Sequence, residues 1–111
     1  EILKSITGLS PASILPLLEL AKEMANNKEQ APDLLEVLQS FYRDLLIYLQ
    51  GRPEEVLINI DLMEKIKRVT KREDTNSLLR KLEAIQACRR NLDRNVNLQL
   101  NFEVLLLNLA A

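Results

Sequence analysis

Apolar side chains recur every three or four residues along most of this chain, which is the spacing of one face of an α-helix. In the first long segment they form one stripe, made of Ile14, Leu17, Leu18, Ala21, Met24 and Ala25. Leu15 and Leu20 lie off this stripe. Ser10 and Pro11 are suited to cap and begin the helix, which is expected to end near Asn26. One face of this helix is therefore predicted to be buried.

Glycine and proline mark the ends of two neighbouring helices. A short helix over residues 2–8 is expected to stop at Gly8, and a new helix begins at Pro32. The second helix carries a wide apolar stripe and should stop near Gly51, where a residue without a side chain suits a helix end. Its apolar residues are Leu34, Leu35, Val37, Leu38, Phe41, Tyr42, Leu45, Leu46 and Leu49.

Capping patterns predict the remaining helices. Asp61 and Glu64 have the spacing of a capping box and should start a short helix whose inward side is Leu62, Ile66 and Val69. Asp74 or Thr75 caps a longer helix that ends near Arg94. Its stripe is Leu78, Leu82, Ile85, Cys88 and Leu92.

The segment Asn95-Val96-Asn97 supplies a turn and a new cap, and the last helix is expected over 98–109. With two glycines and 4% aromatic residues, the chain has little material for a turn-rich β fold. We therefore predict an all-α fold, a compact bundle of five to six helices that forms a single domain over residues 1–111.

The residues that most enzymes need are missing. The chain has no histidine, and its glycines at positions 8 and 51 cannot form a phosphate-binding loop. The acidic pairs Glu54-Glu55 and Glu73-Asp74 fall in polar connections, where we expect solvated surface rather than acid–base chemistry. Cys88 lies on an apolar stripe and is expected to be a small buried hydrophobe. The sequence predicts no catalytic, cofactor or metal site.

Cysteine usage and hydropathy bear on location. A single cysteine allows no internal disulfide and suits a reducing cytoplasm. No apolar run reaches the roughly 18 residues of a membrane span, and the first residues lack the basic start of a signal peptide. We expect a soluble, cytoplasmic protein.

One stretch is strongly basic although the formal net charge of the chain is −1. It contains Lys65, Lys67, Arg68, Lys71 and Arg72. Such a run is usually the solvated face of a helix, but part of it would project outward, where phosphates or an acidic partner could meet it. The low net charge itself argues against a stand-alone nucleic-acid-binding domain.

The last helix is apolar on two sides. Leu98, Phe102, Leu105, Leu106 and Leu109 lie within roughly 100° of arc, whereas Leu100, Val104 and Leu107 occupy another sector. Such a helix is either sandwiched inside the bundle or turns its second side to another subunit. Ile47 adds to the second alternative, because it falls on the otherwise polar side of its helix beside Ser40 and Arg43.

Arg89 falls within the apolar stripe of its helix, where an unpaired charge would cost several kcal/mol by rough estimate. Asp93 is within reach on the same helix, and Glu103 or Asp44 could reach it through the fold. Alternatively, the side chain extends its guanidinium group to water.

A run near the C-terminus combines an arginine, an asparagine-rich turn, a glutamate and a row of leucines: Arg89, Leu92, Asn95, Val96, Asn97, Leu100, Glu103, Val104, Leu105, Leu106 and Leu107. This run resembles the ending of the clamp-loader subunits of bacterial DNA polymerase III, especially the delta-prime subunit. The segments Phe41–Leu46, which contains Asp44, and Asn59–Asp61 are similar to that family in order and spacing. The resemblance covers most of the chain from about Ser10.

The resemblance implies a helical collar, in which such domains hold five related subunits in a ring, with delta-prime beside delta and the gamma or tau copies. ATP, DNA and the sliding clamp would be handled by N-terminal modules that no segment of this chain resembles. DNA would be met only indirectly through the complex, and the polymerase chemistry would belong to other subunits. No small-molecule substrate and no membrane is implied.

Within this resemblance, each matching residue acquires an expected role. Arg89, Asn95, Asn97 and Glu103 would fix the turn and the packing of the helices. A neighbouring subunit would meet Leu100, Val104 and Leu107. Two other functions fit the same residues: an adaptor bundle that binds a partner helix in a groove, and a catalytic accessory domain.

Overall fold

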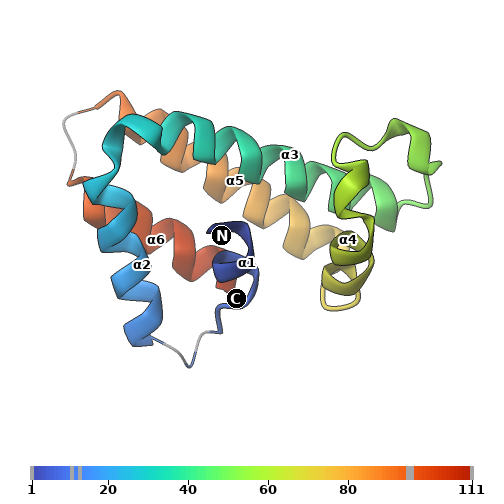
Figure 1. Cartoon of the computed structure of the whole chain (residues 1–111), viewed down its shortest axis with the longest axis horizontal. Helices are drawn as coiled ribbons and strands as arrows, with labels where there is room; N and C mark the ends of the chain where they lie inside the picture. Colours follow the sequence, from blue (N-terminus) through green and yellow to red (C-terminus); the bar gives the residue numbers. More distant parts are fainter. Residues whose placement is uncertain (1, 11, 13, 95–96, 111) are drawn as a thin grey trace.

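The structure, a computed structural model, describes residues 2–10, 12, 14–94 and 97–110 (Figure 1). The α-helices within these residues are α1 (Ile2–Thr7), α2 (Ile14–Asn26), α3 (Ala31–Leu49), α4 (Met63–Thr70), α5 (Thr75–Leu92) and α6 (Leu98–Ala110). Three single turns of 3-10 helix join them, η1 (Lys28–Gln30), η2 (Glu54–Val56) and η3 (Ile60–Leu62). No β-strand occurs in the described residues, and the predicted all-α bundle of five to six helices is confirmed.

The helices form a continuous series of packed pairs. Helix α3 packs along α5, α5 packs along α6, and α6 packs against α2. The short helix α1 also contacts α6, and α4 contacts α3. Figure 1 shows α2 and α6 at one end of the molecule and α4 at the other, and the extents are 40 × 29 × 25 Å.

Local hydrogen bonds explain where three of the helices begin or end. Asp74 and Ser77 cap α5 reciprocally: the backbone N–H of Ser77 donates to Asp74 Oδ1 at 2.8 Å, and that of Asp74 donates to Ser77 Oγ at 2.9 Å. The backbone N–H of Leu100 donates to Asn97 Oδ1 at 2.9 Å at the start of α6. After α3, Gly51 takes a φ of 77°, a conformation that glycine adopts without strain. These caps agree with the sequence predictions.

The predicted cap at Asp61 is wrong. Helix α4 begins directly after η3, and no side chain caps it. The backbone of η3 supplies the turn instead, since the N–H of Leu62 donates to the carbonyl of Asn59 at 2.9 Å. At the start of α2, the N–H of Ala12 donates to Ser10 Oγ at 3.2 Å, and Pro11 lies outside the described residues.

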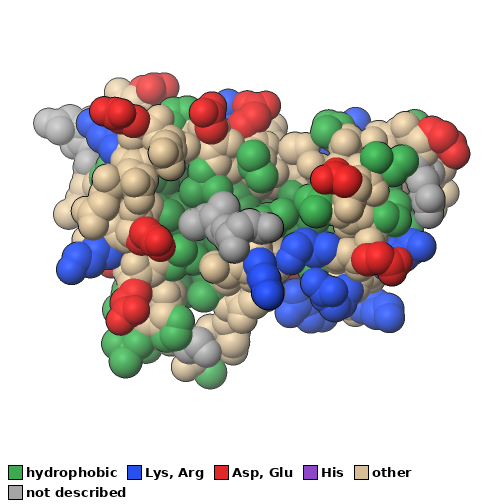
Figure 2. All heavy atoms as spheres, in the orientation of Figure 1, with side chains coloured by type: hydrophobic (Ala, Val, Ile, Leu, Met, Phe, Trp, Pro, Cys, Tyr) green, Lys and Arg blue, Asp and Glu red, His purple; other side chains and the backbone are tan. Residues whose placement is uncertain are grey.

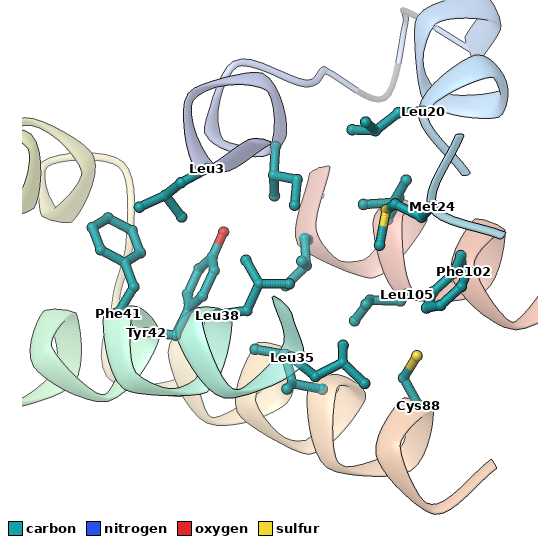
Figure 3. Packing of buried hydrophobic residues seen from close by; sticks show 14 of the residues in the cluster. Leu3, Leu20, Met24, Leu35, Leu38, Phe41, Tyr42, Cys88, Phe102 and Leu105 are labelled. Carbon is teal, nitrogen blue, oxygen red and sulfur yellow. The ribbon is translucent and has the colours of Figure 1, made fainter. Parts of the chain in front are cut away.

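A single hydrophobic cluster holds the helices together (Figure 3). Its largest fully buried side chains include Leu35, Leu38, Phe41 and Tyr42 of α3, Leu17 of α2, Ile85 of α5, and Phe102 and Leu105 of α6. The rings of Phe41 and Tyr42 meet edge to face, with centroids 5.5 Å apart. Core contact therefore comes from every long helix.

The predicted stripe of α2 is wrong at two positions. Leu20, expected to lie off the stripe, is buried, whereas Ile14, expected on it, is exposed. Because α2 packs against α6, its inward face is set by that contact, and Leu17, Leu20, Ala21 and Met24 form it. The first turn of α2 extends past this contact, which leaves Ile14 open to solvent.

Asp44 forms hydrogen bonds that hold the segment between α3 and α4 in place. Its side chain is fully buried and accepts hydrogen bonds from the backbone N–H of Ile58 at 3.0 Å and of Asn59 at 2.6 Å. The Asn59 amide also donates to it at 2.9 Å and to Ser40 Oγ at the same distance. A buried carboxylate needs such donors to offset its lost hydration. Asp44 therefore holds the chain against α3 just before α4 begins.

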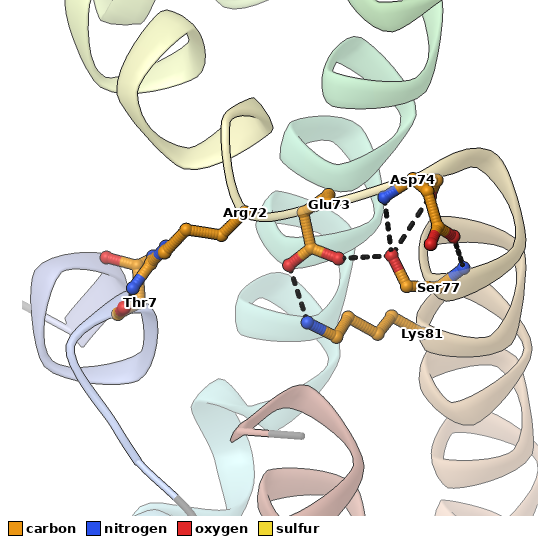
Figure 4. A network of polar contacts seen from close by, with 6 residues as sticks. All are labelled: Thr7, Arg72, Glu73, Asp74, Ser77 and Lys81. Carbon is orange, nitrogen blue, oxygen red and sulfur yellow. Dashed lines mark hydrogen bonds and ion pairs between the residues drawn. The ribbon is translucent and has the colours of Figure 1, made fainter.

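The expectation that Glu73 is solvated surface is also wrong. Its carboxylate is 2.5 Å from Lys81 Nζ, and the two side chains are only 6% and 5% exposed. Ser77 Oγ donates to the same carboxylate at 2.6 Å, and Arg72 nearby donates to the carbonyl oxygen of Thr7 (Figure 4). The end of α1, the end of α4 and the start of α5 thus lie close to this buried ion pair. Glu73, Ser77 and Lys81 follow one another at intervals of four residues, the spacing of one helix face, and this spacing was the available sequence signal.

Cys88 is buried on α5, as the sequence predicts. Burial raises the pKa of its thiol to about 11, while a hydrogen bond with the Asn101 side chain acts in the opposite direction. Because the thiolate is the reactive form, a raised pKa makes this cysteine inert near neutral pH.

Replacing Asp44 with asparagine should lower the free energy of unfolding by about 2–3 kcal/mol, because one oxygen becomes a donor that faces two N–H groups. Urea denaturation followed by circular dichroism measures this loss. Asp61→Asn is the matched control: Asp61 is exposed and caps nothing, so its effect should stay within about 0.5 kcal/mol. Equal effects of the two substitutions would contradict the role assigned to Asp44.

Cys88 should react with a disulfide reagent such as dithionitrobenzoate at least about 100-fold more slowly in the folded chain than in urea at about pH 8. The pKa change from 9.0 to about 11 lowers the thiolate fraction by this factor, and burial slows access further. Absorbance of the released thiol gives both rates. Similar rates in the two conditions would show that the thiol is accessible in the folded protein.

Candidate subunit interface

Helix α6 leaves a row of apolar side chains uncovered. Leu100, Val104 and Leu107 are 56%, 51% and 45% exposed, respectively. They are four and then three residues apart, so they lie in one line along the helix. The opposite sector is buried in the core: Phe102, Leu105, Leu106 and Leu109. We call Leu100, Val104 and Leu107 the α6 strip.

The packing of α6 explains why the strip stays open. Helices α1, α2 and α5 all contact α6, and together they bury its inward sector. Exposed apolar side chains occur elsewhere too, namely Ile14 and Leu15 in the first turn of α2, Val56, Ile58 and Ile60 in the turns between α3 and α4, and Val37, Leu49 and Leu79 on α3 and α5. Three in line on one regular helix form a continuous surface, and such a surface typically marks a contact with another protein.

Polar side chains border the strip. Glu103 and Gln99 lie one turn apart along one edge, where the amide of Gln99 donates to the Glu103 carboxylate at 3.1 Å. Asn108 lies on the other edge and donates to the carbonyl oxygen of Val104 at 3.0 Å. An apolar centre with a polar rim is the usual anatomy of a protein–protein interface.

Ile47 lies on a different surface. It is partly buried against the core and lines a groove of about 520 Å³. The remaining lining residues are Arg43, Leu46, Gln50, Arg52, Val56, Thr75 and Leu79, and no residue of the α6 strip is among them. The structure therefore does not bring Ile47 together with Leu100, Val104 and Leu107.

The partners expected for Arg89 are wrong. Its guanidinium group contacts Gln39 Oε1 and lies 3.3 Å from Glu36 Oε2, so that Arg89 ties α5 to α3. Asp44 is occupied by the chain before α4, and Glu103 lies on the outer edge of α6. The side chain is 36% exposed, so the apolar stem packs inward while the charged head lies at the surface.

The turn before α6 contains the other motif residues. Asn97 caps α6, as described above, while Asn95 lies outside the described residues. Sequence reasoning missed Asn101, a buried amide that donates to the carbonyl oxygen of Cys88 at 3.2 Å and accepts from the Asn91 amide at 3.3 Å. The sequence signal for its burial was its position next to Leu105 on the helical wheel. Asn101 fixes how α6 is rotated against α5, and hence which side of α6 faces out.

The described residues contain no obvious chemical centre. No group of three or more histidine, cysteine, aspartate or glutamate side chains gathers as a metal site would require. In the part of the chain that the structure describes, no helix has both the length and the apolar character needed to cross a bilayer. The α6 strip is therefore the best-defined candidate for function.

Comparison with protein families gives a match over nearly the whole chain. Residues 3–111 match the family model described as DNA polymerase III, delta subunit, C terminal. Neither the curated proteins nor the solved structures give a significant match. The match does not distinguish delta-prime from delta, so the delta-prime assignment stays a prediction. An all-helical bundle, an uncovered apolar strip and this match agree with one another, and the chain belongs to a clamp-loader family, that of the C-terminal domains of DNA polymerase III delta subunits.

Proposed function

We propose that this chain is the collar domain of a delta-prime clamp-loader subunit, and that its α6 strip binds a neighbouring collar domain. In this role it helps to hold the ring of subunits together while the sliding clamp is loaded during DNA replication. The partners are the delta subunit and the gamma or tau copies. The domain itself contributes binding rather than catalysis.

The exposed α6 strip is the observation that carries this proposal. Leaving three large apolar side chains half exposed in water is unfavourable, and covering them in a contact recovers roughly 1 kcal/mol for each. Charged groups are absent from the strip itself, so a partner would meet it without burying an unpaired charge. A neighbouring helix with its own apolar line is the simplest complement.

The delta-prime assignment rests on the resemblance of the run from Arg89 to Leu107. Two of its residues have roles in the structure that agree with a packing motif: Arg89 joins α5 to α3, and Asn97 caps α6. Asn97 fixes where α6 begins, and Arg89 fixes the packing of α3 against α5, on which α6 rests, so neither residue is part of the α6 strip.

The adaptor function remains the second candidate, and the groove at Ile47 favours it. This groove has an apolar floor that includes Leu46 and Leu79, and Arg43 and Arg52 line it as well. A partner helix with an acidic edge would fit there. In that case the α6 strip would not be needed for binding.

Substitution of Leu100, Val104 and Leu107 by serine in one triple variant should weaken binding to the delta and gamma or tau collar domains by roughly 100-fold. The reason is the loss of apolar area that the contact would bury. Light scattering after size-exclusion chromatography measures the mass of the mixed domains, and titration calorimetry measures the affinity.

A second triple variant controls for the loss of exposed apolar side chains in general. It carries Leu15→Ser, Val37→Ser and Ile58→Ser, at exposed positions on other elements, and should bind as the unaltered chain does. Thermal unfolding of both variants tests whether they fold. Normal assembly of the α6 variant would refute the proposal, and loss of binding on changing Ile47 and Leu79 instead would favour the adaptor function.

A further inference from the structure

Helix α4 and the residue pair that follows it carry five cations within eight positions. They are Lys65, Lys67, Arg68, Lys71 and Arg72, accompanied by the single acid Glu64. Ile66, Val69 and Thr70 face the core, so the cations share the remaining sides of the helix. Figure 2 shows Lys and Arg side chains gathered at this end of the molecule. Cations in a last turn also offset the helix dipole, but one or two of them suffice for that.

Two of these cations have a structural role. Lys65 Nζ lies 3.4 Å from Thr7 Oγ1, and the Arg72 guanidinium group donates to the carbonyl oxygen of Thr7 at 3.1 Å. They hold α1 against α4. Arg68 and Lys71, in contrast, are exposed and have no ion pair among the described residues.

Arg68 and Lys71 line a hollow of about 620 Å³ between α4 and the end of α3. The other lining residues are Tyr48, Glu64, Lys67 and Thr70. Three cations thus face one carboxylate, and the Tyr48 side chain adds a phenol that can donate a hydrogen bond. Thr70 is satisfied within its own helix, since its hydroxyl donates to the carbonyl oxygen of Ile66 at 2.9 Å.

We propose that this hollow, with Arg68, Lys71 and Tyr48, binds the phosphate backbone of DNA directly and without sequence preference. Arg68 lies in the last turn of α4 and Lys71 directly follows that turn, so the two side chains leave the same end of the helix. Arginine and lysine both bind phosphate oxygens, and the tyrosine hydroxyl adds a further donor. The inference depends on the charges of α4, and neither on the α6 strip nor on the delta-prime assignment.

Exposed acidic residues lie around α4 as well as at the other end of the molecule, but among the lining residues of the hollow Glu64 is the single acid. Exposed acids gather on α2, η1 and the start of α3: Glu19, Glu23, Glu29, Asp33 and Glu36. Figure 2 shows a group of Lys and Arg side chains at the α4 end, whereas Asp and Glu side chains lie at both ends of the molecule. Although the net charge of the chain is only −1, the cations of α4 form a local basic surface that would attract a phosphate backbone.

Fluorescence anisotropy with a fluorescein-labelled DNA duplex tests the proposal. Nonspecific binding is expected with a Kd on the order of 10⁻⁴–10⁻⁶ M, and raising KCl from about 50 to about 200 mM should weaken it roughly 12-fold if two phosphates are contacted. The double variant Arg68→Ala, Lys71→Ala should lower the slope of log K against log salt by about 1.8. Tyr48→Phe, which removes only the hydroxyl, should weaken binding by about 2- to 10-fold.

Lys22→Ala, Lys28→Ala is the matched control, because it removes the same charge from exposed positions on α2 and η1. It should bind DNA as the unaltered chain does. Equal loss in both double variants, or no detectable binding at about 50 mM KCl, would overturn the proposal. So would equally tight binding of polyglutamate, which would identify a surface for acidic proteins. The α6 triple variant should bind DNA normally, which separates this result from the collar assay.

Discussion

The fold depends on one constraint, that α6 must offer apolar surface to three other helices at once. Helices α1, α2 and α5 all pack against it. A helix in that position needs apolar residues around most of its circumference, and α6 has them. Since no other helix in the described part of the chain covers the last side, the α6 strip remains at the surface. The same feature that organises the core therefore leaves a surface suited to another subunit.

The sequence predicted the helices well because their signals are local. Helical spacing of apolar residues, the Asp74 cap and the turn at Gly51 each act within a few residues, and the structure contains all of them. The open side of α6 was one of two alternatives that its two apolar sectors allowed, and the exposure of Leu100, Val104 and Leu107 decides between them.

Predictions failed where the answer depends on a second helix. Leu20 is buried because α2 meets α6, and its own spacing does not reveal this. Arg89 binds a side chain on α3 that lies fifty residues earlier. Asn101 was missed for the same reason, since its partners belong to α5. Glu73 is a different case, because its partner Lys81 lies on the helix that Glu73 directly precedes. The motif residues of the resemblance that the structure describes mostly shape the packing, and their part in assembly would be indirect.

Asp44 links the packing to the charged end of the molecule. By holding Ile58 and Asn59 against α3, it sets where α4 begins, and α4 carries the cations. The buried Asp44 carboxylate therefore helps to position the cations of α4, which follow it in the sequence.

Helix α1, although only six residues long, contacts both α6 and the cations of the α4 region. It packs on α6, and its Thr7 accepts hydrogen bonds from Lys65 and Arg72 beside the basic surface. A displacement of α1 would therefore change the contacts of both α4 and α6. The relative positions of the cations of α4 and of the α6 strip therefore depend in part on this short helix.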